Sequence, residues 1–271
     1  MFTDFPLHQL PPVDFLASDQ SPAFGPHAPS HRINFYAIVW FQEDGGKHYI
    51  DFEEFQVKKD RVFLIGKNQV HSIASAALPK AKTIVFSSAF FDHIEEAFLR
   101  QLFFPFHNRG ITIPDEMLQP MHQLFGLIML ESDTTADRNL LLKYTTAMLT
   151  HLLRFSNSGF SSLAAADARM LRLFQLLEEN YRENRHASFY AAQIGLTPKR
   201  VNEILRQKMG TTVNGLLTRL LLLEAKRELS HRQFSVKEIA YNLGFSDQSY
   251  FARFFKQHTG LAPEQFKNNG Q

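Results

Sequence analysis

The chain has 271 residues, enough for two domains that each bury a core, and it lacks cysteine, which excludes disulfide bonds, thiolate metal sites and thiol catalysis. Its net charge of +2 is unevenly divided, because residues 1–169 carry 14 basic and 18 acidic side chains while residues 170–271 carry 15 and 9. Only the C-terminal part therefore suits a polyanion, and the absence of a signal peptide or of an apolar run of about 18 residues predicts a cytoplasmic protein without membrane contact.

The first part of the chain changes from a proline-rich segment to short strands. Residues 1–30 contain Pro11-Pro12, Pro22, Pro26 and Pro29, which predicts an extended lead-in. Residues 35–41 and 48–52 then predict a hairpin around Asp44-Gly45-Gly46. Further strands are expected at residues 55–57, 62–65, 71–74 and 83–86. Short strands with polar turns favour a small barrel or jelly roll.

An aromatic segment and two amphipathic helices are expected to follow the strands. Residues 90–106 are rich in phenylalanine and partly helical in pattern, so they either cover the barrel or line an effector pocket. Apolar residues then recur at helical spacing over residues 118–128 and, after Asp137, over residues 140–152. The two helices can form an antiparallel hairpin whose apolar faces either pack on the barrel or contact a second subunit.

A segment rich in serine and glycine separates the two halves of the chain. Residues 157–166 break the helical pattern where the charge balance changes sign, so they are predicted to be a linker. Asp167 can cap the next helix, whose buried stripe is expected to include Met170, Leu173 and Leu177.

One pattern occurs twice in the C-terminal part, at about residues 188–209 and 235–258. Ala191 precedes the run Ile194-Gly195-Leu196-Thr197, and Ala240 precedes Leu243-Gly244-Phe245-Ser246, 49 residues later. A small residue allows helices to cross closely, and glycine allows the left-handed conformation of a sharp turn. Each copy therefore predicts a helix-turn-helix unit.

Capping residues support helices on both sides of these turns. Thr197 and Ser246 are predicted to cap the helix after each turn, with Pro198 in the first helical position. Ser235 and Glu238 predict a capping box before the second unit. Between the units, a leucine-rich helix from Thr212 spans ~18 residues and roughly 27 Å, which is compatible with the ~34 Å between successive major grooves on one face of DNA.

Residues 235–266, SVKEIAYNLGFSDQSYFARFFKQHTGLAPEQF, resemble the C-terminal signature of the AraC/XylS family of bacterial transcription regulators. The upstream stretches LTPKRVNEILRQKMG and LLLLEAKREL resemble the first recognition helix and the linker helix of that family. The resemblance implies sequence-specific binding of double-stranded DNA by both units. This sequence departs from the pattern at Glu203, which corresponds to Arg253 in the second copy, and at Ala262, where a capping serine or threonine is usual.

The polar faces of the two second helices hold the candidate DNA contacts. In that role we expect Lys199, Arg200, Asn202, Glu203 and Arg206 in the first unit, and Gln248, Ser249, Arg253 and Lys256 in the second. Arg253 can pair with guanine through two hydrogen bonds, whereas Arg206 and Lys256, later in their helices, suit phosphates. Glu203 either accepts a hydrogen bond from cytosine or pairs with Arg200 or Arg206. The alternative for the whole set is an ordinary solvated helix face.

Residues 31–73 resemble the cupin sensor domain found at the N-terminus of AraC-type regulators. Cupin enzymes bind metal through histidines and a glutamate, but Ala37 stands where the acidic ligand is expected, and His27 and His31 do not have the usual spacing. We therefore expect no metal, no other cofactor and no catalytic residue. His31, Phe35, Trp40 and His71 are the candidate effector-pocket residues.

Together these features predict an α+β protein: a cupin-like barrel with a helical dimerisation hairpin, followed by an all-helical DNA-binding domain. The expected boundaries are residues 1–30 for the lead-in, 31–156 for the sensor and dimerisation domain, 157–166 for the linker and 167–271 for the DNA-binding domain. The predicted function is a homodimeric transcription regulator that responds to a small-molecule effector and contacts RNA polymerase if it is an activator. The alternatives are a metal-dependent cupin enzyme tethered to DNA and an effector-independent regulator.

Overall fold

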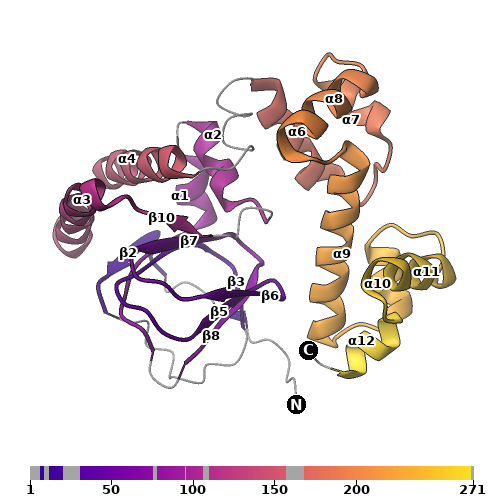
Figure 1. Cartoon of the computed structure of the whole chain (residues 1–271), viewed down its shortest axis with the longest axis horizontal. Coiled ribbons are helices and arrows are strands. Elements are labelled where there is room, and N and C mark those ends of the chain that lie inside the picture. Colours follow the sequence, from indigo (N-terminus) through magenta and orange to yellow (C-terminus); the bar gives the residue numbers. More distant parts are fainter. Residues whose placement is uncertain are drawn as a thin grey trace. The chain divides into compact units, whose positions relative to one another are not determined.

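The structure is a computed structural model of the chain, and it describes residues 7–8, 12–20, 31–75, 78–94, 96–105, 110–156 and 168–269. These residues form two compact units, one within residues 6–161 and the other within residues 162–271. The predicted linker 157–166, the capping residue Asp167 and His27 lie outside the described residues. Figure 1 shows the elements of each unit.

The N-terminal unit contains two five-stranded sheets whose strands pair antiparallel, except for the parallel pair β1 and β3. One sheet has the order β1 (Leu7–His8), β3 (His31–Ile33), β8 (Val70–Ala74), β5 (Lys47–Ile50), β6 (Glu53–Gln56). The other has the order β10 (Ile111–Thr112), β7 (Arg61–Ile65), β4 (Tyr36–Phe41), β9 (Ala81–Phe86), β2 (Phe15–Ser18).

Side-chain alternation along β4 divides the apolar residues of this unit between two cores. Ala37, Val39 and Phe41 belong to one buried cluster, with residues such as Ile50 from the other sheet. Ile38 and Trp40, on the opposite face of the same strand, belong to a second cluster. Successive residues of a strand point to opposite faces, so β4 is buried on both sides.

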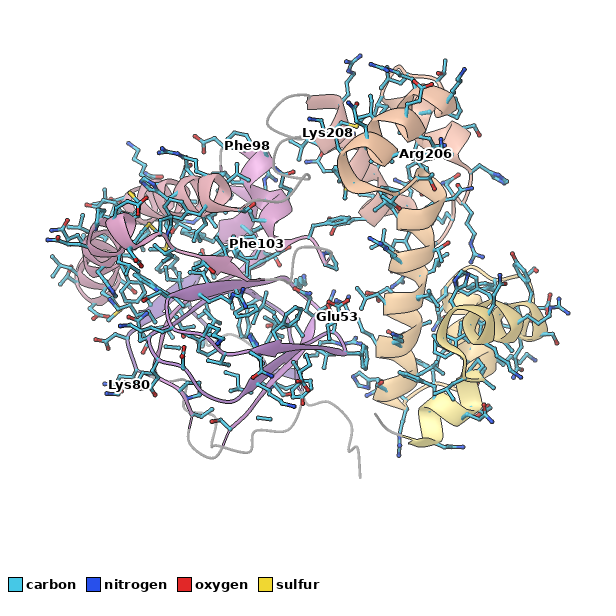
Figure 2. The ribbon with its side chains drawn as sticks, viewed as in Figure 1. Glu53, Lys80, Phe98, Phe103, Arg206 and Lys208 are labelled. Atoms are coloured by element: carbon cyan, nitrogen blue, oxygen red, sulfur yellow. The ribbon has the colours of Figure 1, made fainter. Side chains whose placement is uncertain are left out.

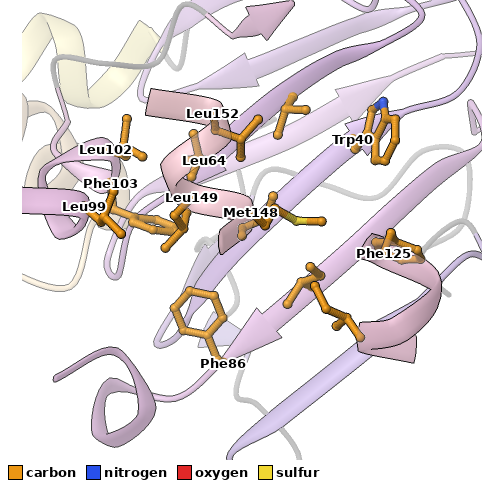
Figure 3. Close-up of a cluster of buried hydrophobic side chains, with 14 of the residues drawn as sticks. Trp40, Leu64, Phe86, Leu99, Leu102, Phe103, Phe125, Met148, Leu149 and Leu152 are labelled. Carbon is orange, nitrogen blue, oxygen red and sulfur yellow. The ribbon is translucent and has the colours of Figure 1, made fainter. Parts of the chain in front are cut away.

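Helices cover the second face of the β4 sheet (Figures 1 and 3). They are the short elements α1 (Ser88–Asp92), α2 (Ala97–Arg100) and η1 (Gln101–Phe103) and the longer helices α3 (Asp115–Asp133) and α4 (Arg138–Phe155). Phe86 and Trp40 of the sheet share one buried cluster with Phe103 of η1, Phe125 of α3 and Met148 of α4. Burying each such side chain contributes about 1.5–3 kcal/mol.

The aromatic segment after β9 is part of this cover. Phe90, Leu102 and Phe103 are at most 4% exposed, and Phe91 and Phe98 pack against the same cluster. The structure therefore favours the first of the two interpretations of residues 90–106, a cover for the sheet. Asp137 caps α4 as predicted, because its Oδ1 accepts a hydrogen bond from the Leu140 amide at 2.9 Å.

The predicted hairpin around Asp44-Gly45-Gly46 is wrong, because β4 and β5 lie in different sheets. Gly45 and Gly46 instead exchange backbone hydrogen bonds with Val57. The hairpin of β5 is made with β6, and its two turn residues, Asp51 and Phe52, have φ of +48° and +72°. Tertiary contacts hold this turn without glycine: Asp51 accepts hydrogen bonds from the Val70 amide at 3.1 Å and from Gln69 Nε2 at 2.5 Å.

Strand β2 was also not expected. Phe15–Ser18 belong to the predicted lead-in, yet they pair antiparallel with β9 in register from Phe15–Phe86 to Ser18–Thr83.

The C-terminal unit is helical throughout its described residues. Its helices are α6 (Ala168–Asn180), α7 (Ala187–Gln193), α8 (Pro198–Met209), α9 (Val213–His231), α10 (Val236–Asn242), α11 (Gln248–Thr259) and α12 (Pro263–Asn269). The long helix α9 contacts α6 and α8, which precede it in the chain, and α10, α11 and α12, which follow it (Figure 1). A β-rich N-terminal part and a helical C-terminal part confirm the predicted α+β class.

Candidate nucleic-acid interface

Helices α7 and α8 form the first helix-turn-helix unit. Ala191 is fully buried, and Gly195 in the turn has φ of +67°, as the motif requires. Thr197 caps α8 by accepting a hydrogen bond from the Arg200 amide at 3.2 Å, and Pro198 occupies the first turn, where its missing N–H costs nothing. The start and direction of α8 therefore follow from four residues within a short stretch of the sequence.

Helices α10 and α11 repeat this arrangement with one difference. Ala240 is fully buried, Gly244 has φ of +75°, and Ser235 and Glu238 form the predicted capping box of α10. The cap of α11, however, is Asp247, whose Oδ1 accepts a hydrogen bond from the Tyr250 amide at 2.7 Å. Ser246 was predicted in this role and is displaced by one residue, because the second turn is one residue longer than the first.

The two second helices have the same burial pattern, residue by residue, over ten positions at an offset of 50. Val201 and Leu205 of α8 are fully buried, as are Phe251 and Phe255 of α11. The opposite face of each helix is open to solvent. Its exposed members are Lys199, Arg200, Glu203 and Arg206 on α8, and Gln248, Ser249, Arg253 and Lys256 on α11. The structure thus places eight of the nine predicted contact residues on solvent-exposed helix faces; Arg206 is labelled in Figure 2 together with the neighbouring exposed Lys208.

Asn202 is the exception among the predicted contact residues. It is partly buried, and its Oδ1 accepts a hydrogen bond from the Val213 amide at 3.0 Å. That amide lies in the first turn of α9, where backbone N–H groups have no partner within the helix. The hydrogen bond to Asn202 therefore connects α8 to the start of the linker helix. Glu203 forms an ion pair with Arg200 at 3.4 Å, which is one of the two alternatives that the sequence left open for it.

Helix α9 spans 19 residues, about 28 Å at 1.5 Å per residue, which agrees with the predicted rod. Thr212 caps it by accepting a hydrogen bond from the Gly215 amide at 3.1 Å. Its buried residues are distributed along its whole length, from Val213 to Leu229. Because both helix-turn-helix units pack on this helix, it holds them a set distance apart.

The departure at Ala262 has a local compensation. The Ala262 amide donates a hydrogen bond to Oε1 of Gln265 at 3.0 Å, just before α12 begins at Pro263. This is one half of a capping box, so the start of α12 does not depend on a serine or threonine.

Three of the four predicted effector-pocket residues belong either to the sheet of β3 and β8 or to the interior cluster that this sheet shares with the other one. His31 and His71 are directly paired across β3 and β8, with ring centroids 4.2 Å apart, and Phe35 belongs to the interior cluster. Trp40 does not join them. It lies on the opposite face of β4, stacked on His122 of α3 at 4.4 Å, with Lys82 Nζ over its ring at 5.2 Å.

His48, which was not among the residues predicted from the sequence, lies beside His71 with ring centroids 5.7 Å apart. His48 is fully buried against Phe41 and Phe63, and neither of its ring nitrogens has a hydrogen-bond partner within the described residues. Burial, with a smaller effect of His31, lowers the pKa of His48 to about 3. The two-residue alternation with the interior residue Ile50 was the signal that could have located it.

Within the described ranges, no three or more histidine, aspartate or glutamate side chains are arranged to hold a metal ion. Among the helices that the structure describes, none combines the length and the hydropathy needed to cross a membrane.

Comparison with known proteins supports the interpretation of the C-terminal unit. A family model described as "Helix-turn-helix domain" matches residues 190–269, from within α7 through α8, α9 and the second unit to α12. The HTH-type transcriptional activator RhaS of Salmonella schwarzengrund is 26% identical over 272 residues, covering 94% of this chain and 95% of its own. RhaS of Salmonella arizonae has the same identity and coverage.

Among solved structures, ToxT from Vibrio cholerae O395 aligns with 94% of this chain and 95% of its own, at a TM-score of 0.48 and 15% identity. A DNA-binding transcriptional dual regulator from Escherichia coli K-12 aligns with 38% of this chain and 91% of its own, at a TM-score of 0.34 and 22% identity. With its two helix-turn-helix units joined by a long helix, the C-terminal unit is a helix-turn-helix domain of the AraC type, and the chain is similar along nearly its whole length to HTH-type transcriptional activators.

Proposed function

We propose that the chain regulates transcription by inserting α8 and α11 into successive major grooves on one face of a DNA duplex. The observation that supports this most is the matched burial of the two helices, which leaves the same face of each one open and polar. The first residues of a recognition helix are those that reach base edges. Lys199 and Glu203 on α8, and Gln248, Ser249 and Arg253 on α11, are proposed to read bases, while Arg200, Arg206 and Lys256 bind phosphates.

Asn202 has a double role in this proposal. Its Oδ1 accepts a hydrogen bond from the Val213 amide, which holds the side chain toward α9. This orientation disfavours the bidentate contact with adenine that a free asparagine makes. We expect it to position α8 more than to select a base.

The test compares Arg253→Ala with Lys256→Ala on DNA selected from a random duplex library by the unaltered chain. Arg253→Ala should lose about 1–3 kcal/mol of discrimination at one base pair, because a bidentate guanine contact disappears. Lys256→Ala should weaken binding to all sequences and reduce the salt slope by about one, as expected for a phosphate contact. Arg172→Ala is the matched control, since Arg172 is an exposed arginine of α6 paired with Glu179 outside the proposed interface. Unchanged affinity and specificity of Arg253→Ala would contradict the assignment.

We further propose that residues 31–156 form a cupin-like sensor and dimerisation domain, that residues 157–166 are the linker and that residues 167–271 bind DNA. The proposed ligand is a small, weakly polar molecule, supported by the imidazole of His48, which lies near His31 and His71 beside an apolar cluster. A ligand that binds only the folded protein raises the thermal midpoint, so the test is melting against a metabolite panel. A shift that persists unchanged in His48→Phe would show that the ligand binds elsewhere.

The proposed homodimer is supported by two exposed leucines of α3, Leu127 at 45% and Leu130 at 63% exposure. Leu130→Glu should shift the sedimentation of the protein toward monomer, whereas the control Leu16→Glu, the same change at an exposed leucine of β2, should not. We also propose a cytoplasmic, non-enzymatic protein that contacts RNA polymerase if it is an activator; the RhaS relatives are named as transcriptional activators. Metal analysis of the purified protein would separate this role from that of a metal-dependent enzyme.

A further inference from the structure

The segment between α6 and α7, residues 181–186, contacts the turn of the second helix-turn-helix unit. Arg185 Nη2 donates a hydrogen bond to the carbonyl oxygen of Leu243 at 2.8 Å, across 58 positions of sequence. Its guanidinium also lies over the ring of Phe245, 3.9 Å from the centroid. Between these two residues is Gly244, at which a Cβ would collide with the carbonyl oxygen of Arg182. Two backbones therefore approach each other more closely than any side chain at position 244 would allow.

The same segment is anchored to the first unit and to the linker helix. The hydroxyl of Tyr190, a fully buried residue of α7, donates a hydrogen bond to the Asn184 carbonyl at 2.6 Å. Arg182 donates a hydrogen bond from Nε to the Tyr181 hydroxyl at 2.8 Å and pairs with Glu224 of α9 at 3.8 Å. A continuous set of contacts thus runs from α7, through residues 181–185, to the turn between α10 and α11.

The chemistry of Arg185 suits a strong contact. Leu243 is the C-cap of α10, where unpaired carbonyl oxygens and the helix dipole favour a cation. The flat guanidinium can donate to that carbonyl while stacking on Phe245, which a lysine cannot do as well. Desolvation lowers the pKa of Arg185, in keeping with a cation that is partly withdrawn from water. Residue 185 precedes the stretch matched by the family model, which begins at residue 190.

We propose that Arg185 is a positioning residue, which locks the orientation of the second helix-turn-helix unit relative to the first. It thereby sets the spacing between the two short DNA sequences, here called boxes, that the two units bind. The covalent path from α9 to α10 passes through residues 232–235, where Arg232 has φ of +54°. This path and the packing of α10, α11 and α12 on α9 hold the second unit on the side that faces α9. The contact of Arg185 holds it from the side of the first unit, so that it cannot rotate about the end of α9. The inference rests on the proposed reading of DNA by both units.

The experiment selects DNA from a random duplex library with the full chain, with Arg185→Ala and with the control Arg172→Ala. The unaltered chain and the control should enrich two boxes at one spacing. Arg185→Ala should enrich the same two boxes over several spacings, and its preference for the original spacing over one changed by a base pair should fall about tenfold, because preorganisation is lost. Affinity for each single box should stay the same.

Arg185→Met is a second variant in case Arg185→Ala fails to fold, since it keeps an apolar side chain beside Phe245 and removes the guanidinium with its donor and its charge. If both variants keep one spacing with undiminished preference, the inference is refuted while DNA reading by both units stands. If the unaltered chain enriches a single box or no motif, tandem reading itself is refuted and the inference falls with it. A spread of spacings in the control Arg172→Ala would also refute the inference. Loss of an exposed arginine of α6, paired with Glu179, would then have the same effect as loss of Arg185.

Discussion

Replacing the two turn glycines by alanine should destabilise the C-terminal unit by different amounts. Gly195 and Gly244 occupy the same position in the two helix-turn-helix units and have similar φ values, +67° and +75°. Their surroundings differ, because a Cβ at Gly195 meets no atom within 4 Å, whereas a Cβ at Gly244 collides with the Arg182 carbonyl and lies 3.1 Å from its carbon. The pair therefore separates backbone strain from the tertiary contact.

The backbone term is common to both substitutions. A left-handed conformation costs an L-residue about 1–2 kcal/mol, which is the whole expected loss for Gly195→Ala. At Gly244 the backbone of residues 182–185 must also move, and forced overpacking typically adds about 1–3 kcal/mol. Gly244→Ala should therefore lower the free energy of unfolding by about 2–5 kcal/mol.

Urea unfolding of the full chain measures both losses, with far-ultraviolet circular dichroism as the helical signal. The only tryptophan, Trp40, lies in the N-terminal unit, so its fluorescence transition is an internal control that neither substitution should shift. Equal losses in the two variants, or a larger loss for Gly195→Ala, would refute the close approach of residue 182 to the second turn.

Three further predictions test other features of the structure. Asp247→Ala should cost about 1 kcal/mol of stability, as loss of an N-cap does, while Ser246→Ala should be nearly neutral in the same urea titration; the reverse order would restore Ser246 as the cap. Asn202→Asp should keep the hydrogen bond to the Val213 amide and hence the stability, whereas Asn202→Ala should lose about 1 kcal/mol, and equal stability of the two would contradict that bond. Because the pKa of folded His48 is about 3 and its ordinary value is 6.5, the unfolded chain takes up the proton first. Stability should therefore fall by about 1.4 kcal/mol per pH unit as the pH drops below about 6.5 toward 3, and His48→Phe should remove this part of the slope of Trp40-monitored unfolding; an unchanged slope would show that His48 is not held neutral by the fold.

The sequence by itself was enough to locate the features that depend on neighbouring residues. The turns at Gly195 and Gly244, the caps Thr197, Ser235 and Asp137, and the apolar stripes of α8 and α11 all involve contacts within about four positions. Their geometry is set by backbone conformation and helical period, which a single stretch of chain displays. The repeat of this pattern then made the two units recognisable, and with them the face that is proposed to bind DNA.

Other features were decided only when distant segments met. The turn at Gly45-Gly46 carries the chain between sheets, and Trp40 faces α3 while His48 faces the interior, because strand pairing selects which side of each alternating strand is buried. The Val213 amide donates a hydrogen bond to Asn202, and Arg185 donates one to the Leu243 carbonyl. Backbone groups at helix ends lack partners within the helix, so they bond to whichever side chain the packing brings near. Local periodicity determines what each element is, but the partners of its polar ends are a property of the assembled fold.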